Sequence, residues 1–197
     1  MSKGELTRQT IVDAATRVAS RVGLGGLTIG SLAADTGLSK SGLFAHFNSK
    51  ESLQLQVLDH ASARFVDLVV RPALKAPRGE PRVRELFDHW FAWCRDELSA
   101  GCLFVAAATE LDDQPGPVRD QLAKVQRDWL ETIATVFATG ISEGQFRADA
   151  DPEQFAQDLY GVMLAYHHAS RLLDDPRAEQ RARRALDRLL EAARVPS

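Results

Sequence analysis

Apolar residues recur along this chain at the three- and four-residue spacing of amphipathic helices, and no segment shows the alternation typical of a strand. A first helix is predicted over residues 6–21, with its apolar stripe continuing to Val22 before the glycines of 23–26 end it. Two short helices are predicted between residues 28 and 50. Later stripes predict helices over residues 49–70, 82–98, 102–111, 118–140, 152–173 and 177–193, with loops at 71–81 and 112–117. The pattern predicts an all-α fold of about nine helices.

The stretch TIGSLAADTGLSKSGLFAHFNSK, residues 28–50, is predicted to hold its two short helices on either side of a tight turn. Thr28 can cap the first helix, because its hydroxyl can accept from an exposed backbone N–H of the first turn. Gly37 can end that helix in the left-handed conformation, and Ser39 can cap the second helix. Leu38 is expected to re-enter the core. This combination predicts a helix-turn-helix.

The second of these helices is predicted to be anchored from one side only. Leu43 and Phe47 lie four residues apart and should both face the core. Small or polar hydrogen-bonding residues surround these anchors, namely Ser39, Lys40, Ser41, Gly42 and His46. A slim helix of this kind can enter the major groove of DNA, where base edges are read. Lys50 follows at the start of the next helix, where backbone N–H groups also favour phosphate.

From the first helix to about residue 60, the sequence resembles the DNA-binding domain of the TetR family of bacterial transcriptional regulators. The resemblance covers the hydrophobic positions, the turn and the exit HF-x-x-K-E, while GCLF and LDDQPGPVRD look like one branch of that family. It implies a homodimer that binds a palindromic double-stranded DNA operator, with a C-terminal domain that senses a small molecule. Residues 1–50 would form the DNA-binding domain and residues 51–197 the ligand-sensing and dimerisation domain. The helix over 51–70 would connect the two.

The resemblance also implies roles for residues of the motif. Phosphates would be contacted by Thr28, Ser39 and Lys50. Positions at or near the groove would be Lys40, Ser41, Gly42 and His46. The family often has Tyr where this chain has Phe44, so a phenolic hydroxyl for a phosphate is missing. The ring of Phe44 could offer its edge to a thymine methyl or a sugar, or simply pack.

Charge and composition narrow the partners further. Residues 1–60 carry six Lys or Arg and five Asp or Glu, within a chain of net charge −3. We therefore expect a modest electrostatic contribution per subunit, with dimerisation doubling the phosphate contacts. No run of 18 apolar residues predicts a membrane span, and the start MSKGELTRQT lacks an apolar signal segment, so a cytoplasmic protein is expected. Cys94 and Cys102 are interpreted as reduced thiols.

The sequence does not favour enzymatic or metal-binding chemistry. It contains no G-x-S-x-G elbow, Walker loop, G-x-G-x-x-G or H-E-x-x-H motif. A metal site can be assembled on paper from His89, His167, His168, Cys94, Cys102 and Glu110. Adjacent histidines point to different sides of a helix, however, and so do His89 and Cys94. We expect no catalytic residues, no metal and no cofactor.

A ligand pocket is a better use of the C-terminal helices. The candidate lining combines large apolar side chains with a few polar groups, namely Phe65, Trp90, Cys94, Phe104, Glu110, Trp129, Ile133, Met163, Tyr166 and His167. Each aromatic residue in that set could instead belong to an ordinary core. Glu110 could meet a cationic ligand or a buried partner.

The helices over 152–173 and 177–193 are candidates for the homodimer interface. A very short turn joins them, so they should pack as an antiparallel hairpin. Two such hairpins could pair across a two-fold axis as a four-helix bundle, or each could serve only its own core. Leu68 and Leu173 are expected on the inward stripes of their helices.

These patterns lead us to predict a TetR-like DNA-binding transcriptional regulator. We expect a repressor that is released from a palindromic operator by a small apolar or aromatic effector. The alternative from another class is a helical small-molecule-binding or adaptor protein whose helix-turn-helix is structural only.

Overall fold

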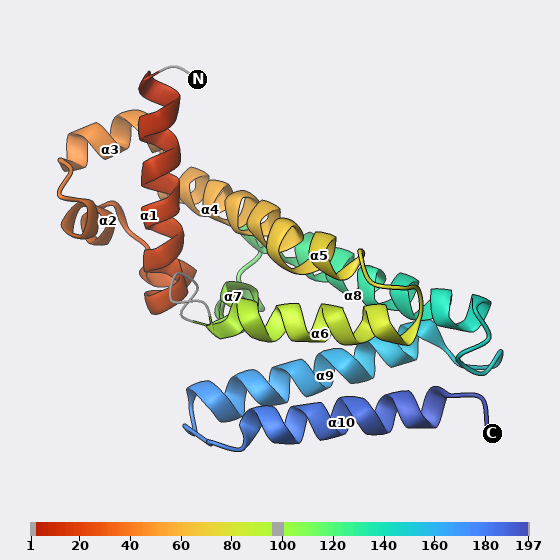
Figure 1. Ribbon diagram of the computed structural model, residues 1–197. Helices are drawn as coiled ribbons and strands as arrows, with labels where there is room; N and C mark the ends of the chain where they lie inside the picture. Colours follow the sequence, from red (N-terminus) through yellow and green to blue (C-terminus); the bar gives the residue numbers. More distant parts are fainter. Residues whose placement is uncertain (1–2, 96–100, 197) are drawn as a thin grey trace. The chain divides into compact units, whose positions relative to one another are not determined.

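The protein is all-helical (Figure 1). The computed structural model describes residues 3–95 and 101–196, apart from the side chains of residues 3–7, 44 and 45. Its α-helices are α1 (Lys3–Gly26), α2 (Ile29–Thr36), α3 (Lys40–Phe47), α4 (Lys50–Phe65), α5 (Arg71–Ala73), α6 (Glu80–Arg95), α7 (Leu103–Leu111), α8 (Pro117–Ser142), α9 (Pro152–Arg171) and α10 (Ala178–Ala193). No strand forms within those ranges, where a single β-bridge pairs Phe146 with Arg194. The predicted fold class is therefore confirmed.

No helix in the described part of the chain is both long and apolar enough to cross a bilayer.

Contacts along the chain define two compact units. Unit 1 comprises Met1–Val66 and Trp93–Val125, and unit 2 comprises Asp67–Ala92 and Gln126–Ser197. Helices α6 and α8 therefore contribute residues to both units.

Unit 1 is built around α1, which packs against α2, α4 and α7 (Figure 1). Ala15 and Ala19 on α1 are completely buried, and their small side chains allow neighbouring helices to approach closely. The larger side chains of this core that are completely buried include Leu24, Leu27, Leu32, Leu43, Phe47, Leu53, Val57 and Leu58. The first four helices thus share one apolar interior.

Unit 2 contains the α9–α10 hairpin, whose two helices lie side by side in Figure 1. Asp151 caps α9 by accepting from the backbone N–H groups of Glu153 and Gln154, and Pro152 occupies the first turn. Tyr166 of α9 packs edge-on against Phe91 of α6, with ring centroids 4.5 Å apart. The predicted antiparallel hairpin is therefore present, and α6 covers part of it.

The helix predicted over residues 49–70 is not α-helical along its whole length. α4 stops at Phe65, and residues Val66–Val70 form a π-helical turn. A π-helical turn bonds residue i to i+5 and so shifts the side chains that follow relative to the α-helical stripe. As a result Leu68, which we predicted to be buried, is 46% exposed, and Val69 is buried in its place.

Three other apolar residues predicted to face inward are exposed. Val22 lies next to Gly23, whose φ of +80° breaks the helical path of α1. Leu38 lies in the short link between α2 and α3 and is 41% exposed. Leu173 lies beyond the end of α9, where helical spacing no longer applies. The predicted loop over 71–81 also contains one helical turn, α5.

Glu80 is expected to make the stability of unit 2 depend on pH. Arg194 donates to its carboxylate at 2.6 and 2.8 Å, and Arg84 at 2.9 Å. The hydrogen bonds from Arg194, with help from Arg84 and against the effect of burial, hold the pKa of Glu80 below its ordinary value of 4.5. A carboxylate with a lowered pKa stabilises the fold at neutral pH, and this contribution disappears as the pH falls through the folded-state pKa.

We therefore expect Glu80→Gln to lower the melting temperature by about 2–4 °C at pH 7. The gap between wild type and variant should close below the ordinary carboxyl pKa of 4.5. Calorimetry from pH 7 to below pH 4.5 measures the melting temperatures of both proteins. Glu143→Gln is the control, because the ion pair of Glu143 with Arg78 is long, at 3.8 Å. A gap that stays constant with pH would show that the charge of Glu80 is not what stabilises unit 2.

Candidate DNA-binding site

Local hydrogen bonds fix the start and end of α2. Thr28 Oγ1 accepts from the backbone N–H of Ser31 at 3.0 Å, and Ser31 Oγ accepts from the backbone N–H of Thr28 at 2.9 Å. This reciprocal pair is a capping box. At the other end Gly37 has φ +67° and ψ 10°, and its N–H donates to the Ala33 carbonyl at 3.0 Å. The predicted cap and turn are confirmed.

Helix α3 is capped at its start and buried along one side. Ser39 Oγ accepts from the backbone N–H of Gly42 at 3.1 Å, so the Ser39 side chain caps the first turn of α3. Leu43 and Phe47 have no exposed surface, and Leu32 of α2 is buried with them. These anchors determine which face of α3 points outward.

The outward face of α3 is small and polar. Four of the predicted DNA-contacting residues are exposed there, namely Ser39, Lys40, Ser41 and Gly42. His46 is half-buried, and its ring lies 6.3 Å from that of Phe47. The Lys40 side chain forms no hydrogen bond or ion pair with the residues that the structure describes. The side chain of Phe44 lies outside the described part of the chain.

Two residues predicted to contact phosphate already have partners in the folded chain. The Thr28 hydroxyl belongs to the capping box and lies 3.2 Å from Ser31 Oγ. Lys50 Nζ donates to the Gly25 carbonyl at 2.7 Å, so it ties the start of α4 to the last turn of α1. Both side chains remain exposed and can also be reached from outside.

Glu110 contacts the same turn of α1, at the backbone N–H of Gly25. We considered it for a ligand pocket, but its Oε2 accepts from the backbone N–H of Gly25 at 2.7 Å. Gly23 has a φ of +80°, which favours glycine, and a Cβ there would lie 2.0 Å from Glu110 Oε1, so the Glu110 carboxylate would have to move. Sequence reasoning could not find this contact, because the two partners are 85 residues apart.

The other candidate pocket residues belong to two separate sets. In unit 1 the ring of Phe65 packs edge-on against that of Phe104, with centroids 5.7 Å apart, and Cys94 is not part of a disulfide. The second set lies in unit 2 and contains Trp90, Trp129, Ile133, Met163, Tyr166 and His167. Trp90 and Tyr166 are in ring contact at 5.6 Å.

All members of the two sets except Cys94 and His167 are buried. Burial, with smaller effects from the charges of Arg171 and His168, lowers the pKa of His167, which is therefore neutral at pH 7. The apolar members of each set thus lie in the interior of their unit.

Helix α2 is capped and ends at the Gly37 turn, and α3 is buried on one side and exposed and polar on the other. This arrangement defines a helix-turn-helix DNA-binding protein. The model of bacterial regulatory proteins of the tetR family matches residues 11–57, and the model of the tetracyclin repressor-like C-terminal domain matches residues 79–186. The chain belongs to the TetR family and is a transcriptional regulator, not an enzyme.

Individual relatives agree with this assignment. The HTH-type transcriptional repressor DhaR of Mycobacterium sp. (strain GP1) is 27% identical over 154 residues, which cover 77% of this chain and 76% of DhaR. A TetR transcriptional regulator from Chloroflexus aurantiacus J-10-FL is 27% identical, with a TM-score of 0.87 and all of both chains covered. AibR, crystallised with isovaleryl coenzyme A and operator DNA, has the same fold at 19% identity. Its TM-score is 0.71, over 96% of this chain and 99% of AibR.

Proposed function

We propose that this regulator is a homodimeric repressor that leaves a palindromic operator when a small apolar or aromatic effector binds its C-terminal part. The exposed polar face of α3, held outward by Leu43 and Phe47, carries the proposal. Support for repression comes from the likeness to the repressor DhaR. Support for an operator and an effector comes from AibR, which was crystallised with both.

Each residue of the motif has a proposed role on DNA. Lys40, Ser41, Gly42 and His46 would lie against base edges, and the edge of Phe44 against a thymine methyl or a sugar. Ser39, Thr28 and Lys50 would contact phosphates, which position the protein without reading sequence. For Lys50 this means sharing its ammonium between the Gly25 carbonyl and a phosphate.

Effector binding would act through the connecting helix. Residues 1–50 would bind DNA, residues 51–197 would sense the ligand and dimerise, and the helix over 51–70 would link the two. In one form of the dimer the two recognition helices would be misplaced for the operator. An effector that binds this form more tightly lowers the DNA affinity, by the difference between its binding free energies for the two forms. Such a repressor works where the bacterial chromosome lies, in the cytoplasm.

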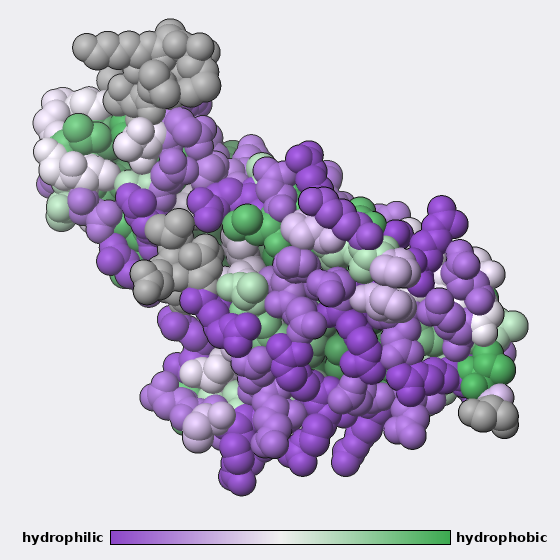
Figure 2. All heavy atoms as spheres, in the orientation of Figure 1, coloured by the Kyte–Doolittle hydropathy of each residue, from purple (hydrophilic) through white to green (hydrophobic). Residues whose placement is uncertain are grey.

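We propose that the homodimer forms through α9 and α10, with the exposed stripe of α9 at its centre. That stripe carries Gln157, Gly161, Leu164, Ala165 and His168, and Leu172 follows beyond the helix end. Leu172 is 70% exposed and Leu164 is 38% exposed, which supports a partner on this side. The outer face of α10 is charged instead, and Figure 2 shows the surface over it as mainly hydrophilic.

Gly161→Arg is expected to dissociate the dimer. A Cβ at Gly161 meets no atom within 4 Å in its own chain, so the substitution leaves the single chain intact. Across a two-fold axis it would place two unpaired cations in the contact, and we expect the dimer dissociation constant to rise at least about 100-fold. Sedimentation equilibrium measures it.

The matched control is Ser142→Arg, which adds the same charge at the exposed last residue of α8, outside the proposed interface. This variant should stay dimeric. A Gly161→Arg protein with the oligomeric state of wild type would exclude the α9 stripe from the interface.

A gel-shift assay tests the proposed function itself. The probe is the palindrome found upstream of the protein's own gene, with a random duplex of equal length as the competitor. We expect retardation of the palindrome that survives excess random duplex. Failure to retard it at low salt, or equal competition by both duplexes, would refute sequence-specific repression.

A further inference from the structure

The two cysteines of the chain flank the connection between α6 and α7, and both belong to unit 1. Cys94 is half-buried in the last turn of α6, whereas Cys102 is buried and directly precedes α7. Neither is part of a disulfide. The Cys94 thiol donates a hydrogen bond to the Cys102 sulfur, so the two sulfurs are neighbours in the folded chain.

The surroundings of Cys102 favour its thiolate. The hydrogen bond from Cys94 has the largest effect and lowers the pKa of the Cys102 thiol, against the effect of burial. Cys102 occupies the N-cap position of α7 and makes no regular cap hydrogen bond, but the backbone N–H groups of Val105 and Phe104 near its sulfur act in the same direction. The Trp93 indole N–H adds a smaller effect. The thiolate, rather than the thiol, is the form that attacks another sulfur.

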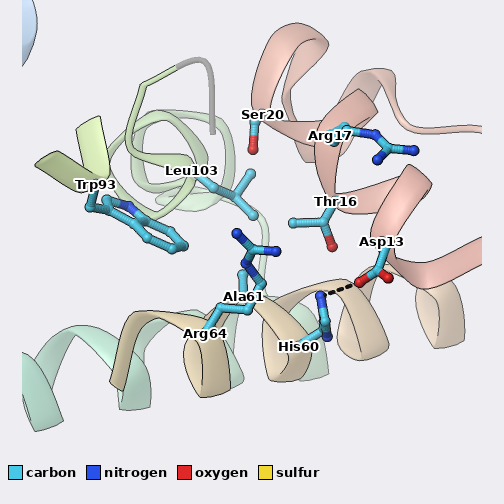
Figure 3. Close-up of a pocket in the computed structure, with 9 residues that line it drawn as sticks. All are labelled: Asp13, Thr16, Arg17, Ser20, His60, Ala61, Arg64, Trp93 and Leu103. Atoms are coloured by element: carbon cyan, nitrogen blue, oxygen red, sulfur yellow. Dashed lines mark ion pairs between the residues drawn. The ribbon is translucent and has the colours of Figure 1, made fainter. Parts of the chain in front are cut away.

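A small oxidant can approach the cysteine pair through a cavity in unit 1. Trp93 and Leu103, the sequence neighbours of the two cysteines, line one side of this partly enclosed space of about 160 Å³ (Figure 3). Residues of α1 and α4 line the other sides. The volume admits several water-sized molecules, and hydrogen peroxide is little larger than water. The cavity therefore brings a hydroperoxide to the residues beside both sulfurs.

We propose that Cys94 and Cys102 form a reversible disulfide when the protein meets a hydroperoxide. The Cys94 thiol, the more exposed of the two, takes one peroxide oxygen and becomes a sulfenic acid, while the O–O bond breaks and the other oxygen leaves as water. The Cys102 thiolate then attacks the Cys94 sulfur, and the S–S bond forms as the S–O bond breaks. The leaving hydroxide takes up the proton that Cys102 had lost. In sum, two thiols and one hydrogen peroxide give one disulfide and two water molecules.

The disulfide would change how α7 packs on α1. It is shorter than the hydrogen bond that it replaces, so it draws the start of α7 towards the end of α6. Helix α7 packs against α1, where Glu110 accepts from the N–H of Gly25, and Lys50 of α4 donates to the carbonyl of the same residue. A shift of α7 therefore reaches the base of the helix-turn-helix. We expect oxidation to weaken operator binding, a consequence that rests on the proposed function, whereas the disulfide itself does not.

Peptide mapping of the full-length protein tests the disulfide without DNA. Trypsin cuts after Arg95, so residues 85–95 and 96–119 are released as separate peptides from the reduced protein. After treatment with hydrogen peroxide we expect these two peptides to stay joined within one chain and to separate again in dithiothreitol. Separate peptides after peroxide, or a bond found only between two chains on a non-reducing gel, would overturn the proposal.

Two variants assign the roles of the cysteines. Cys102→Ser should leave the sulfenic acid on Cys94, where dimedone traps it. Cys94→Ser removes the exposed sulfur, so dimedone labelling after peroxide should be at least about tenfold lower than in Cys102→Ser. Circular dichroism checks that both variants are folded. Equal labelling of the two folded variants would contradict the assignment of Cys94 as the residue that peroxide oxidises.

The gel-shift assay tests the consequence for DNA. Peroxide should weaken operator binding by the wild type at least about tenfold, with recovery in dithiothreitol, and should change binding by Cys94→Ser less than about twofold. A wild type that forms the disulfide and binds the operator as tightly as before would refute the regulatory role. A protein that fails to bind the operator before oxidation would refute the proposed function, while the peptide map still decides whether the disulfide forms.

Discussion

Gly42→Trp is expected to lower the affinity for the operator by at least about 100-fold. Gly42 lies on the exposed face of α3, and an indole there would fill the space that the helix needs to reach the base edges. Because a homodimer inserts two such helices, the substitution weakens the contacts with both half-sites of the operator. The variant should retain only the salt-sensitive binding that it shows towards any duplex, which a competition gel-shift assay separates from specific binding.

The fold should survive this substitution. The atom nearest to a Cβ at Gly42 is the Ser39 hydroxyl oxygen at 3.1 Å, which a small shift can accommodate. Ala63→Trp adds the same bulk at an exposed position of α4 and should bind the operator within about threefold of wild type. If the Gly42→Trp protein held the operator as tightly as the Ala63→Trp protein, α3 would not be the recognition helix.

Leu43→Ala is expected to destabilise the protein by about 2–5 kcal/mol. Leu43 has no exposed surface and supports α3 from behind, so truncation leaves a cavity under the recognition helix. The lost anchor should also weaken operator binding, because α3 no longer has a fixed outward face. Urea denaturation followed by circular dichroism measures the stability.

Leu43→Met keeps the volume of the side chain and serves as the control, with an expected loss below about 1.5 kcal/mol. Faster hydrogen exchange of the backbone amides of α2–α4 in Leu43→Ala would show that the stability is lost in the helix-turn-helix region. If Leu43→Ala cost no more than Leu43→Met, the support for α3 would have to come from other residues.

Much of the fold could be predicted because caps and periodicity are local. The hydroxyls of Thr28 and Ser39 and the carboxylate of Asp151 each sit where a helix begins, and Gly37 sits where one ends. Each acts within three or four residues of itself, so its effect can be read from the sequence. For the same reason the outward face of α3 was predictable from Leu43 and Phe47 alone.

What the sequence could not provide depends on contacts between distant segments. Lys50 and Glu110 reach the same residue, Gly25, by bonds of 2.7 Å to its carbonyl and its N–H. Nothing in the local pattern of α4 or α7 indicates this, and we had assigned one of the two to phosphate and considered the other for a ligand.

The π-helical turn at Val66–Val70 was missed because its α-helical stripe is intact in the sequence.

A dimethyl sulfate footprint of the protein on its palindrome tests most directly whether α3 lies in the major groove. Guanine N7 faces that groove, whereas adenine N3 faces the minor groove. We expect protected guanines in two half-sites whose centres are about 10 base pairs apart, with adenine N3 unprotected and all protection lost in the Gly42→Trp protein. Protection confined to the minor groove, or an identical footprint with Gly42→Trp, would contradict recognition through the segment from Ser39 to His46.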